Sequence, residues 1–254
     1  MTLAPNGVLP IDKPSGWTSF DVVAVARRVI GAKRVGHGGT LDPLATGVLP
    51  LLVGPATKFA DRIHTASKVY AAVVTFGTET ATDDREGAPT RSAAVPDVGI
   101  EAIDAALEAF RGEISQIPPA YAAVKVDGRR AYARARAGET VVLQARRVTI
   151  ERLAIASWEP PDLRLLVVCT SGTYIRSLAR DIGRALGSAA HLGGLRRLAV
   201  GALTLDDALS VDALRGTPAA RERLRPADDR ILELAARFRE APAADLLADW
   251  GRSE

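Results

Sequence analysis

The segment "RVGHGGTLDPLATGVLP", residues 34–50, contains one carboxylate, Asp42, among glycines and apolar residues. Pro43 restricts Asp42 to extended backbone, and the preceding glycines permit tight turns and the close approach of a ligand. Leu41 and Leu44 favour burial, so we expect Asp42 to be held at the edge of a core. A carboxylate fixed there is suited to act as a nucleophile or a general base. The alternative is structural, because Asp commonly caps a turn through its own backbone.

Other familiar catalytic arrangements are missing from the sequence. The three histidines are far apart, and no HExxH, CxxC or carboxylate cluster provides a metal site. There is no GxxxxGK[ST] motif for a nucleotide, and Leu41 occupies the position of the last glycine in GxGxxG. No GxSxG elbow is present. We therefore expect an enzyme of this sequence to use side chains alone, with no metal, nucleotide or organic cofactor.

Arginine dominates the basic residues and is concentrated in a few segments. Only five of the 33 Lys and Arg residues are lysine, and the net charge is +3. "GRRAYARARAG" (128–138) and "ARRV" (145–148) are rich in arginine, with Tyr121 and Tyr132 in or beside them. Arginine pairs with phosphate and stacks on bases, so the pattern favours a nucleic-acid partner. Two plainer alternatives are the codon bias of a GC-rich genome and a solvated charged face.

The elements that must position Asp42 can be predicted on both sides of it. "TSFDVVAVARRVIG" (18–31) predicts a helix with Thr18 as its N-cap, Asp21 three residues on and Gly31 at its end. "VLPLLVG" (48–54) predicts a buried strand. "KVYAAVVTFGTET" (68–80) predicts a strand that is covered on both faces.

Further along the chain, helices and strands alternate without repeated βαβ units. The patterns predict a loop over 82–97, helices over 97–112 and 173–187, strands over about 141–155 and 163–170, and helical structure without strands after about 205. The predicted fold class is therefore α+β.

The totals are those of an ordinary globular protein. The chain has 254 residues, of which 47% are hydrophobic and 25% charged, and no apolar run reaches the roughly 18 residues that span a bilayer. The N-terminus does not have the pattern of a secretory signal, and the single cysteine, Cys169, excludes an intramolecular disulfide. These features predict a cytoplasmic protein without a membrane partner.

Several segments together resemble one known family, the TruB-type tRNA pseudouridine-55 synthases. "GHGGTLDPLATGVLP" closely resembles the catalytic loop of that family, and "VLPIDKPSGWTSFDVV" (8–23) is similar to its N-terminal Lys-Pro segment. The other similar segments follow in the family's order: "KVYAAVVTFGTETATDDREG" (68–87), "QIPPAYAAVKVDGRRAYARARAG" (116–138), "CTSGTYIRSLARDIG" (169–183) and "AHLGGLRRLAVGAL" (190–203). The resemblance covers about residues 8–205.

The resemblance implies a role for individual residues. Asp42 corresponds to the catalytic nucleophile, and Tyr70 to the tyrosine that packs against the target base and takes part in the proton step at its C5. Arg176 corresponds to the arginine that pairs with the catalytic carboxylate, which would keep Asp42 ionised despite its burial. His37 belongs to the loop that helps to evict the target base from the RNA.

The remaining implied site residues bind RNA or support the site. Tyr174 and Leu195 match positions that line the pocket, although a plain core role is nearly as well suited to Leu195. Lys125, Arg129 and Arg130 belong to an RNA-contacting insertion at about 116–140. The residues implied to support the active site are Lys13, Pro14 and Gly39.

The activity that the resemblance implies is the isomerisation of uridine 55 in the T-loop of tRNA by base flipping and rearrangement of the glycosidic bond. No cofactor is needed, the partner is the T-arm of tRNA, and the protein is expected to be a monomer. The implied fold is α+β, with a mixed, mostly antiparallel central sheet flanked by helices. The expected domains are a catalytic domain over 1–205 and a short helical segment over 206–254, too short for a complete PUA-like domain. A tRNA-folding chaperone that needs no catalysis is the alternative function.

Three local departures from the family pattern stand out. Position 38 is Gly where the family often has Thr or Ala, which we expect to loosen the loop. Ser171 stands where many members have Lys, and "GALTL" (201–205) replaces a frequent Gly-x-Phe segment. The change at position 38 leaves Asp42 itself untouched, whereas Ser171 would remove one contact to the RNA or substrate.

Overall fold

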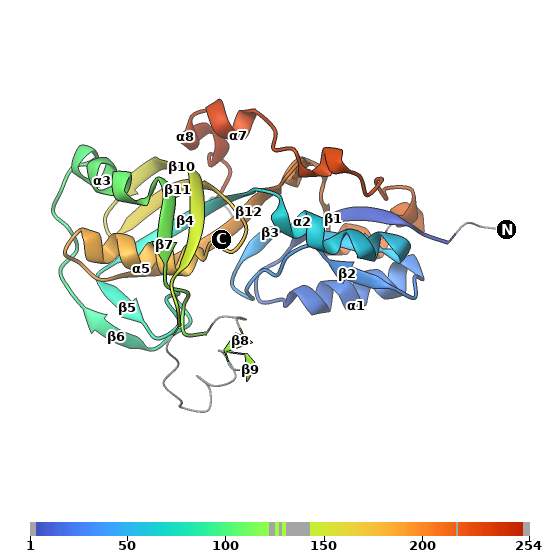
Figure 1. The fold of residues 1–254 in the computed structure, drawn as a ribbon, viewed down its shortest axis with the longest axis horizontal. Coiled ribbons are helices and arrows are strands. Elements are labelled where there is room, and N and C mark those ends of the chain that lie inside the picture. Colours follow the sequence, from blue (N-terminus) through green and yellow to red (C-terminus); the bar gives the residue numbers. More distant parts are fainter. Residues whose placement is uncertain (1–3, 122–124, 127–128, 131–142, 217, 251–254) are drawn as a thin grey trace. The chain divides into compact units, whose positions relative to one another are not determined.

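The computed structural model describes residues 4–121, 125–126, 129–130, 143–216 and 218–250. The chain folds into two compact units (Figure 1). Unit 1 comprises residues 1–71 and 195–241, and unit 2 comprises residues 72–194 and 242–254. Strands β4 (Lys68–Phe76) and β12 (Ala190–Val200) each run from one unit into the other.

Unit 1 contains a mixed sheet in the order β14-β1-β3-β12. β1 (Gly7–Lys13) pairs antiparallel with β3 (Thr46–Val53) and parallel with β14 (Leu209–Ser210), and β3 pairs parallel with β12. The short strands β2 (Val35–His37) and β13 (Leu203–Thr204) add to β3 and β12. The helices of this unit are α1 (Ser19–Ile30), α2 (Ala60–Thr65), α6 (Val211–Gly216) and α7 (Arg237–Glu240).

Both faces of the β1–β3 pair are covered, which explains why these strands are apolar at nearly every position. Leu9 and Ile11 of β1 belong to a core cluster with residues of α1 and α6, whereas Val8 belongs to a second cluster that includes Ile63 of α2. Successive side chains of a strand point to opposite faces, so each face needs its own apolar set. α1 begins with the predicted capping box and ends at Gly31 in the left-handed conformation, with φ +64°.

Unit 2 contains strands in the order β4-β11-β10-β7. β10 (Arg146–Glu159) pairs antiparallel with both β11 (Asp162–Cys169) and β7 (Gly112–Gln116). β5 (Thr78–Thr80) and β6 (Pro89–Ser92) form a separate hairpin. Helices α3 (Ile100–Leu107), α5 (Ile175–Ala185) and α8 (Ala243–Leu246) belong to this unit, and β8 (Lys125–Val126) pairs with β9 (Arg129–Arg130).

The α+β class and the mixed, mostly antiparallel sheet are confirmed. Two local predictions are wrong: the segment 82–97 is not all loop, because it contains β6, and the chain after residue 205 contains the short strand β14. Both strands form through pairing with distant or neighbouring strands rather than through a pattern of their own. None of the described helices is long and apolar enough to cross a membrane.

Candidate active site

Asp42 lies on the loop of unit 1 that connects β2 to β3. The backbone N–H of Ala45 donates to the Asp42 carbonyl oxygen at 3.1 Å, which closes a four-residue turn. Asp at the first position and Pro at the second are residues that favour such a turn. Leu41 and Leu44 are buried as predicted, and Asp42 is half-buried. The local sequence thus fixes a carboxylate at the edge of the core.

Lys13 supports this turn from the end of β1. Its side chain is completely buried. Nζ donates to the carbonyl oxygens of Pro14 (2.9 Å), Trp17 (2.7 Å) and Pro43 (3.2 Å). The N–H of Gly16 donates to the same Pro43 carbonyl at 2.9 Å. One ammonium therefore ties the turn after Asp42 to the Lys-Pro segment.

Burial also changes the ionisation of Lys13. It lowers the pKa of the ammonium to about 8, because removal from water disfavours the charged form. The carboxylate of Asp42 acts in the opposite direction on this pKa, and the Arg197 guanidinium acts in the same direction as burial. The pKa of Lys13 therefore depends on the charges of both Asp42 and Arg197.

Two serines extend the support to the residues on either side of Asp42. Ser19, at the start of α1, donates to the Leu41 carbonyl at 3.3 Å, and its oxygen accepts from the Leu41 N–H at 3.0 Å. Ser15 donates to the Leu44 carbonyl at 3.3 Å. The helix that the capping box starts at Thr18 thus places a hydroxyl against the loop that carries Asp42.

The structure places four further predicted site residues in unit 1. Gly39 is buried and has φ +137°, a conformation that L side chains rarely adopt. Tyr70 is half-buried on β4, Leu195 is buried on β12, and Pro14 is half-buried beside Lys13.

His37 ends β2 and is also half-buried in unit 1. Its ring meets the edge of the Phe20 ring, with centroids 5.7 Å apart and an interplanar angle of 88°. Burial lowers the pKa of His37, and the nearby His64 and Arg197 lower it further. The neutral imidazole is therefore favoured at pH 7.

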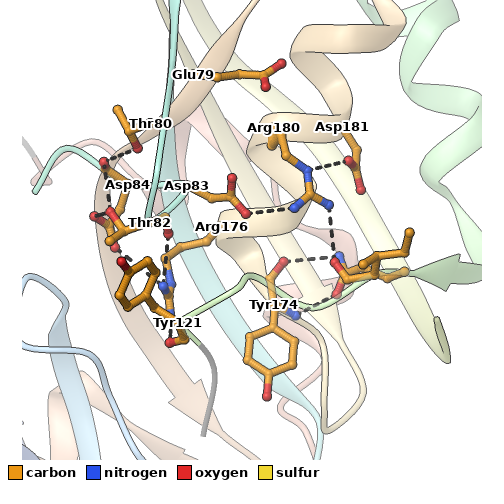
Figure 2. Close-up of polar contacts among 12 residues, drawn as sticks. Glu79, Thr80, Thr82, Asp83, Asp84, Tyr121, Tyr174, Arg176, Arg180 and Asp181 are labelled. Atoms are coloured by element: carbon orange, nitrogen blue, oxygen red, sulfur yellow. Dashed lines mark hydrogen bonds and ion pairs between the residues drawn. The ribbon is translucent and has the colours of Figure 1, made fainter. Parts of the chain in front are cut away.

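Arg176 lies in unit 2, on the first turn of α5, and is buried. Figure 2 shows its guanidinium against the turn that contains Thr82 and Asp84. Nη1 donates to the Thr82 carbonyl at 3.0 Å and lies 3.7 Å from Oδ2 of Asp84, and Nη2 donates to the Tyr121 carbonyl at 3.4 Å. The direction of this arginine is thus fixed by the turn as well as by its own helix.

The acidic turn itself is held in several ways. Thr82 donates to Oδ1 of Asp84 at 2.5 Å, and Thr80 donates to the Asp84 carbonyl at 2.6 Å. Asp83 has φ +59° and forms an ion pair with Arg180 at 2.7 Å. Burial raises the pKa of Asp83, and the positive charge of Arg180 opposes that rise. Arg180, one turn beyond Arg176, is therefore occupied by a structural ion pair.

Tyr174, the predicted pocket residue of unit 2, precedes α5 and is half-buried. Its backbone is held by the side-chain amide of Gln116 on β7. Gln116 Oε1 accepts from the Tyr174 N–H at 2.8 Å, and Nε2 donates to the Tyr174 carbonyl at 3.1 Å. Gln116 thus bonds to both the N–H and the carbonyl of Tyr174, the residue that precedes α5.

The basic insertion is described in part. Lys125 pairs with Arg130 and Val126 with Arg129 in the backbone ladder of β8 and β9. Tyr132 and the remaining arginines of 128–138 lie outside the described residues. The predicted pairing of Asp42 with Arg176 joins residues of different units and stays a prediction.

Matches to known families account for most of the chain. Residues 27–175 match the family model for the TruB family pseudouridylate synthase (N terminal domain). Residues 176–232 match the model for the tRNA pseudouridylate synthase B C-terminal domain. The chain belongs to the TruB family.

Relatives of this TruB-family chain share its sequence over most of its length. A tRNA pseudouridine synthase B of Arthrobacter sp. (strain FB24) is 48% identical over 215 residues, covering 82% of this chain and 70% of the relative. One of Mycobacterium tuberculosis (strain ATCC 25618 / H37Rv) is 45% identical over 252 residues, covering 98% and 83%. One of Burkholderia lata is 50% identical over 209 residues, covering 82% and 65%.

Solved structures with a similar fold contain longer chains. A chain in the crystal structure of the archaeal box H/ACA sRNP Nop10–Cbf5 complex has a TM-score of 0.67 at 27% identity, covering 90% of this chain and 62% of that chain. A chain in the structure of an H/ACA RNP bound to a substrate RNA containing 2′-deoxyuridine has a TM-score of 0.64 at 27% identity, covering 88% and 60%. This chain therefore spans less than two thirds of those chains.

The structure shows residues that hold the site in place and that sequence reasoning missed. They are Ser19, Asp84 and Arg197. Arg197 had a signal, because "LRRL" places two arginines on one strand and alternation turns one of them inward.

No group of three or more His, Cys, Asp or Glu side chains in the described part of the chain could hold a metal ion.

Proposed function

We propose that this TruB-family chain converts uridine 55 in the T-loop of tRNA to pseudouridine, with Asp42 as the catalytic carboxylate. An isomerase acting on tRNA agrees with the family and with the names of the relatives. The observation that carries the assignment is the loop around Asp42. Backbone groups on both sides of that residue are bonded to the buried side chains of Lys13 and Ser19, and Asp42 itself is half-buried.

The reaction exchanges one bond of the base for another. The C1′–N1 bond breaks, the freed base rotates, and C1′ joins C5. The proton on C5 leaves, and N1 takes up a proton, so the product is an isomer of the substrate. A carboxylate beside the base provides a nucleophile or a base for this sequence without a metal or an organic cofactor. The target uridine must leave its stack to reach the side chain, as in other enzymes that act on bases.

Other residues take the roles that the family pattern gives them. Tyr70 packs against the flipped base and assists removal of the C5 proton. His37 and the basic insertion with Lys125, Arg129 and Arg130 contact the RNA of the T-arm. Neutral His37 is compatible with a packing or hydrogen-bonding role against a base and adds no charge at pH 7.

Arg176 pairs with Asp42 when the site is assembled. Asp84 and the Thr82 carbonyl support this role, since they fix the guanidinium from the side of unit 2. The guanidinium gives the carboxylate an opposite charge in a partly buried site. The planar fork of arginine also limits the orientation of the carboxylate, which a lysine would do less well.

The test uses unmodified tRNA labelled with tritium at C5 of uridine, because joining C5 to C1′ releases that label to water. Asp42→Asn is the decisive variant. Asn also favours the first position of a turn, so it keeps the local structure and removes the nucleophile. We expect tritium release to fall to background, with the product of the wild type mapped to position 55. Asp61→Asn, at an exposed site of α2, is the control that removes one carboxylate from the same unit.

Full tritium release by Asp42→Asn would refute the nucleophile and leave only the turn-forming role. Release by the wild type at a uridine outside the T-loop would refute the proposed position. A wild type that binds and refolds tRNA but releases no label would favour the chaperone instead.

A further inference from the structure

Arg197 is a buried arginine, and within the described residues its side-chain hydrogen bonds all go to the segment 39–48, which carries Asp42. It lies on β12, in the part of the strand that belongs to unit 1, and its side chain is 1% exposed. Nε donates to the Val48 carbonyl at 2.7 Å, Nη2 to the Gly39 carbonyl at 3.0 Å and Nη1 to the Thr40 carbonyl at 3.3 Å. Each nitrogen of the guanidinium thus has a backbone acceptor in the segment 39–48.

No carboxylate in the described part of the chain lies within ion-pair distance of Arg197. A buried charge is costly unless it is paired, and here only carbonyl dipoles compensate it. The neighbouring arginine differs because it has a carboxylate partner. Arg196, one residue earlier on the same strand, forms an ion pair with Asp12 at 2.7 Å and is partly exposed. Packing alone does not explain a buried arginine at position 197, since an apolar side chain would fill the same space at a lower free-energy cost.

The strand register explains how one residue reaches both ends of the loop. β12 runs parallel to β3, with Arg197 opposite Gly47. A Cβ on Gly47 would lie 2.2 Å from the Arg197 carbonyl oxygen, so only glycine allows this approach. The backbone of Arg197 thus packs on the end of the loop, while its guanidinium bonds to Gly39 and Thr40 at the beginning.

We infer that Arg197 is a positioning residue for the reaction, which sets the path of the loop 39–48 and thereby the place of the Asp42 carboxylate. The inference rests on the proposed function, in which Asp42 is the nucleophile. Asp42 stands between the two segments that Arg197 joins, two residues after Thr40. A nucleophile displaced by about 1 Å can lose about 100-fold in rate. Arg197 is too deeply buried to contact tRNA itself, so binding of the tRNA should change little.

Arg197→Lys provides the main test, because it keeps the charge but cannot bond to all three carbonyls in the same geometry. We expect the single-turnover rate of tritium release to fall roughly 10- to 100-fold, while the Kd for tRNA stays within about threefold of the wild type. Exchange of the amide hydrogens of residues 38–48 should become faster. The matched control is Arg221→Lys, an arginine of the same unit whose Nε donates to the Ile30 carbonyl at 2.7 Å, outside the segment 39–48, and it should react at the rate of the wild type.

The outcomes separate the inference from its alternatives. A purely structural role predicts a less stable Arg197→Lys whose folded molecules react at the full rate, and that result would overturn the inference. If Arg197→Lys does not fold, Gly39→Ala takes its place. An alanine at φ +137° strains the backbone whose carbonyl accepts from Nη2, so it should disturb the same contact. A full rate in that variant would also overturn the inference.

The Asp42→Asn variant tells which proposal has failed. If Asp42→Asn is active, the nucleophile is wrong whatever Arg197→Lys does. If Asp42→Asn is inactive and Arg197→Lys reacts at the full rate, the proposed function stands and only the role of Arg197 is refuted.

Discussion

Raising the pH above 8 should stabilise the folded protein through Lys13. Burial lowers the pKa of its ammonium from about 10.5 to about 8 in the folded protein. The unfolded chain keeps the higher pKa, so between these values the unfolded state binds more protons than the folded state. The free energy of unfolding must then rise with pH over this window, and below pH 8 the contribution of Lys13 no longer changes.

The size of the effect follows from the two pKa values. One group that titrates at 8 in the folded state and 10.5 in the unfolded state adds about 1.6 kcal/mol of stability between pH 8 and 9.5. Lysines, tyrosines and the cysteine elsewhere in the chain also titrate in this range. The measured quantity must therefore be a difference between two proteins.

Urea unfolding of the wild type and of Lys13→Met, at several values between pH 7 and 10, gives this difference. The variant loses three hydrogen bonds to backbone carbonyls and should be less stable throughout. Its deficit relative to the wild type should grow by about 1.6 kcal/mol between pH 8 and 9.5. Lys33→Met removes an exposed lysine of the same unit and serves as the control. A deficit for Lys13→Met that is the same at every pH would refute the lowered pKa.

Three further variants test other contacts. The two arginines bonded to Glu79 lower its pKa to about 2, so Glu79→Gln should cost about 2 kcal/mol at pH 7, and acid unfolding curves should converge with those of the wild type as the pH falls from 4.5 towards 2. Gly47→Ala should destabilise the fold in urea by more than Gly16→Ala, because both need positive φ but only the first meets backbone, and equal losses would contradict this. Ser19→Ala leaves the buried N–H of Leu41 without its acceptor and should cost about 1–3 kcal/mol; it should also slow tritium release, and an unchanged rate would show that this contact does not position the loop.

Local patterns sufficed where one element could be identified from its own residues. The helix over 18–31 was predicted from its capping box and final glycine, and α1 has both. The strand over 68–80 was predicted as covered on both faces, and β4 is buried at most positions, although Gly77 separates it from β5. In these cases the periodicity and the end signals lie within one window of sequence.

Contacts between distant segments could not be found in this way. Gly38 was expected to loosen the loop, but its N–H donates to the Pro50 carbonyl at 2.8 Å, and an added Cβ would lie 2.4 Å from Cγ2 of Ile63. The space that a larger residue would fill is occupied by a side chain of α2. Position 38 is therefore closely packed, and only the structure shows which residue fills it.

Two buried cations hold the loop around Asp42 through its backbone. Lys13 and Arg197 come from distant parts of the sequence, are both buried cations, and each donates to backbone carbonyls of the segment 39–48. Carbonyl acceptors keep each ammonium or guanidinium in place without forming an ion pair that would neutralise it. Two buried cations thus donate to backbone carbonyls on both sides of Asp42. Such an arrangement fixes the backbone before and after that residue, and with it the place of the Asp42 side chain.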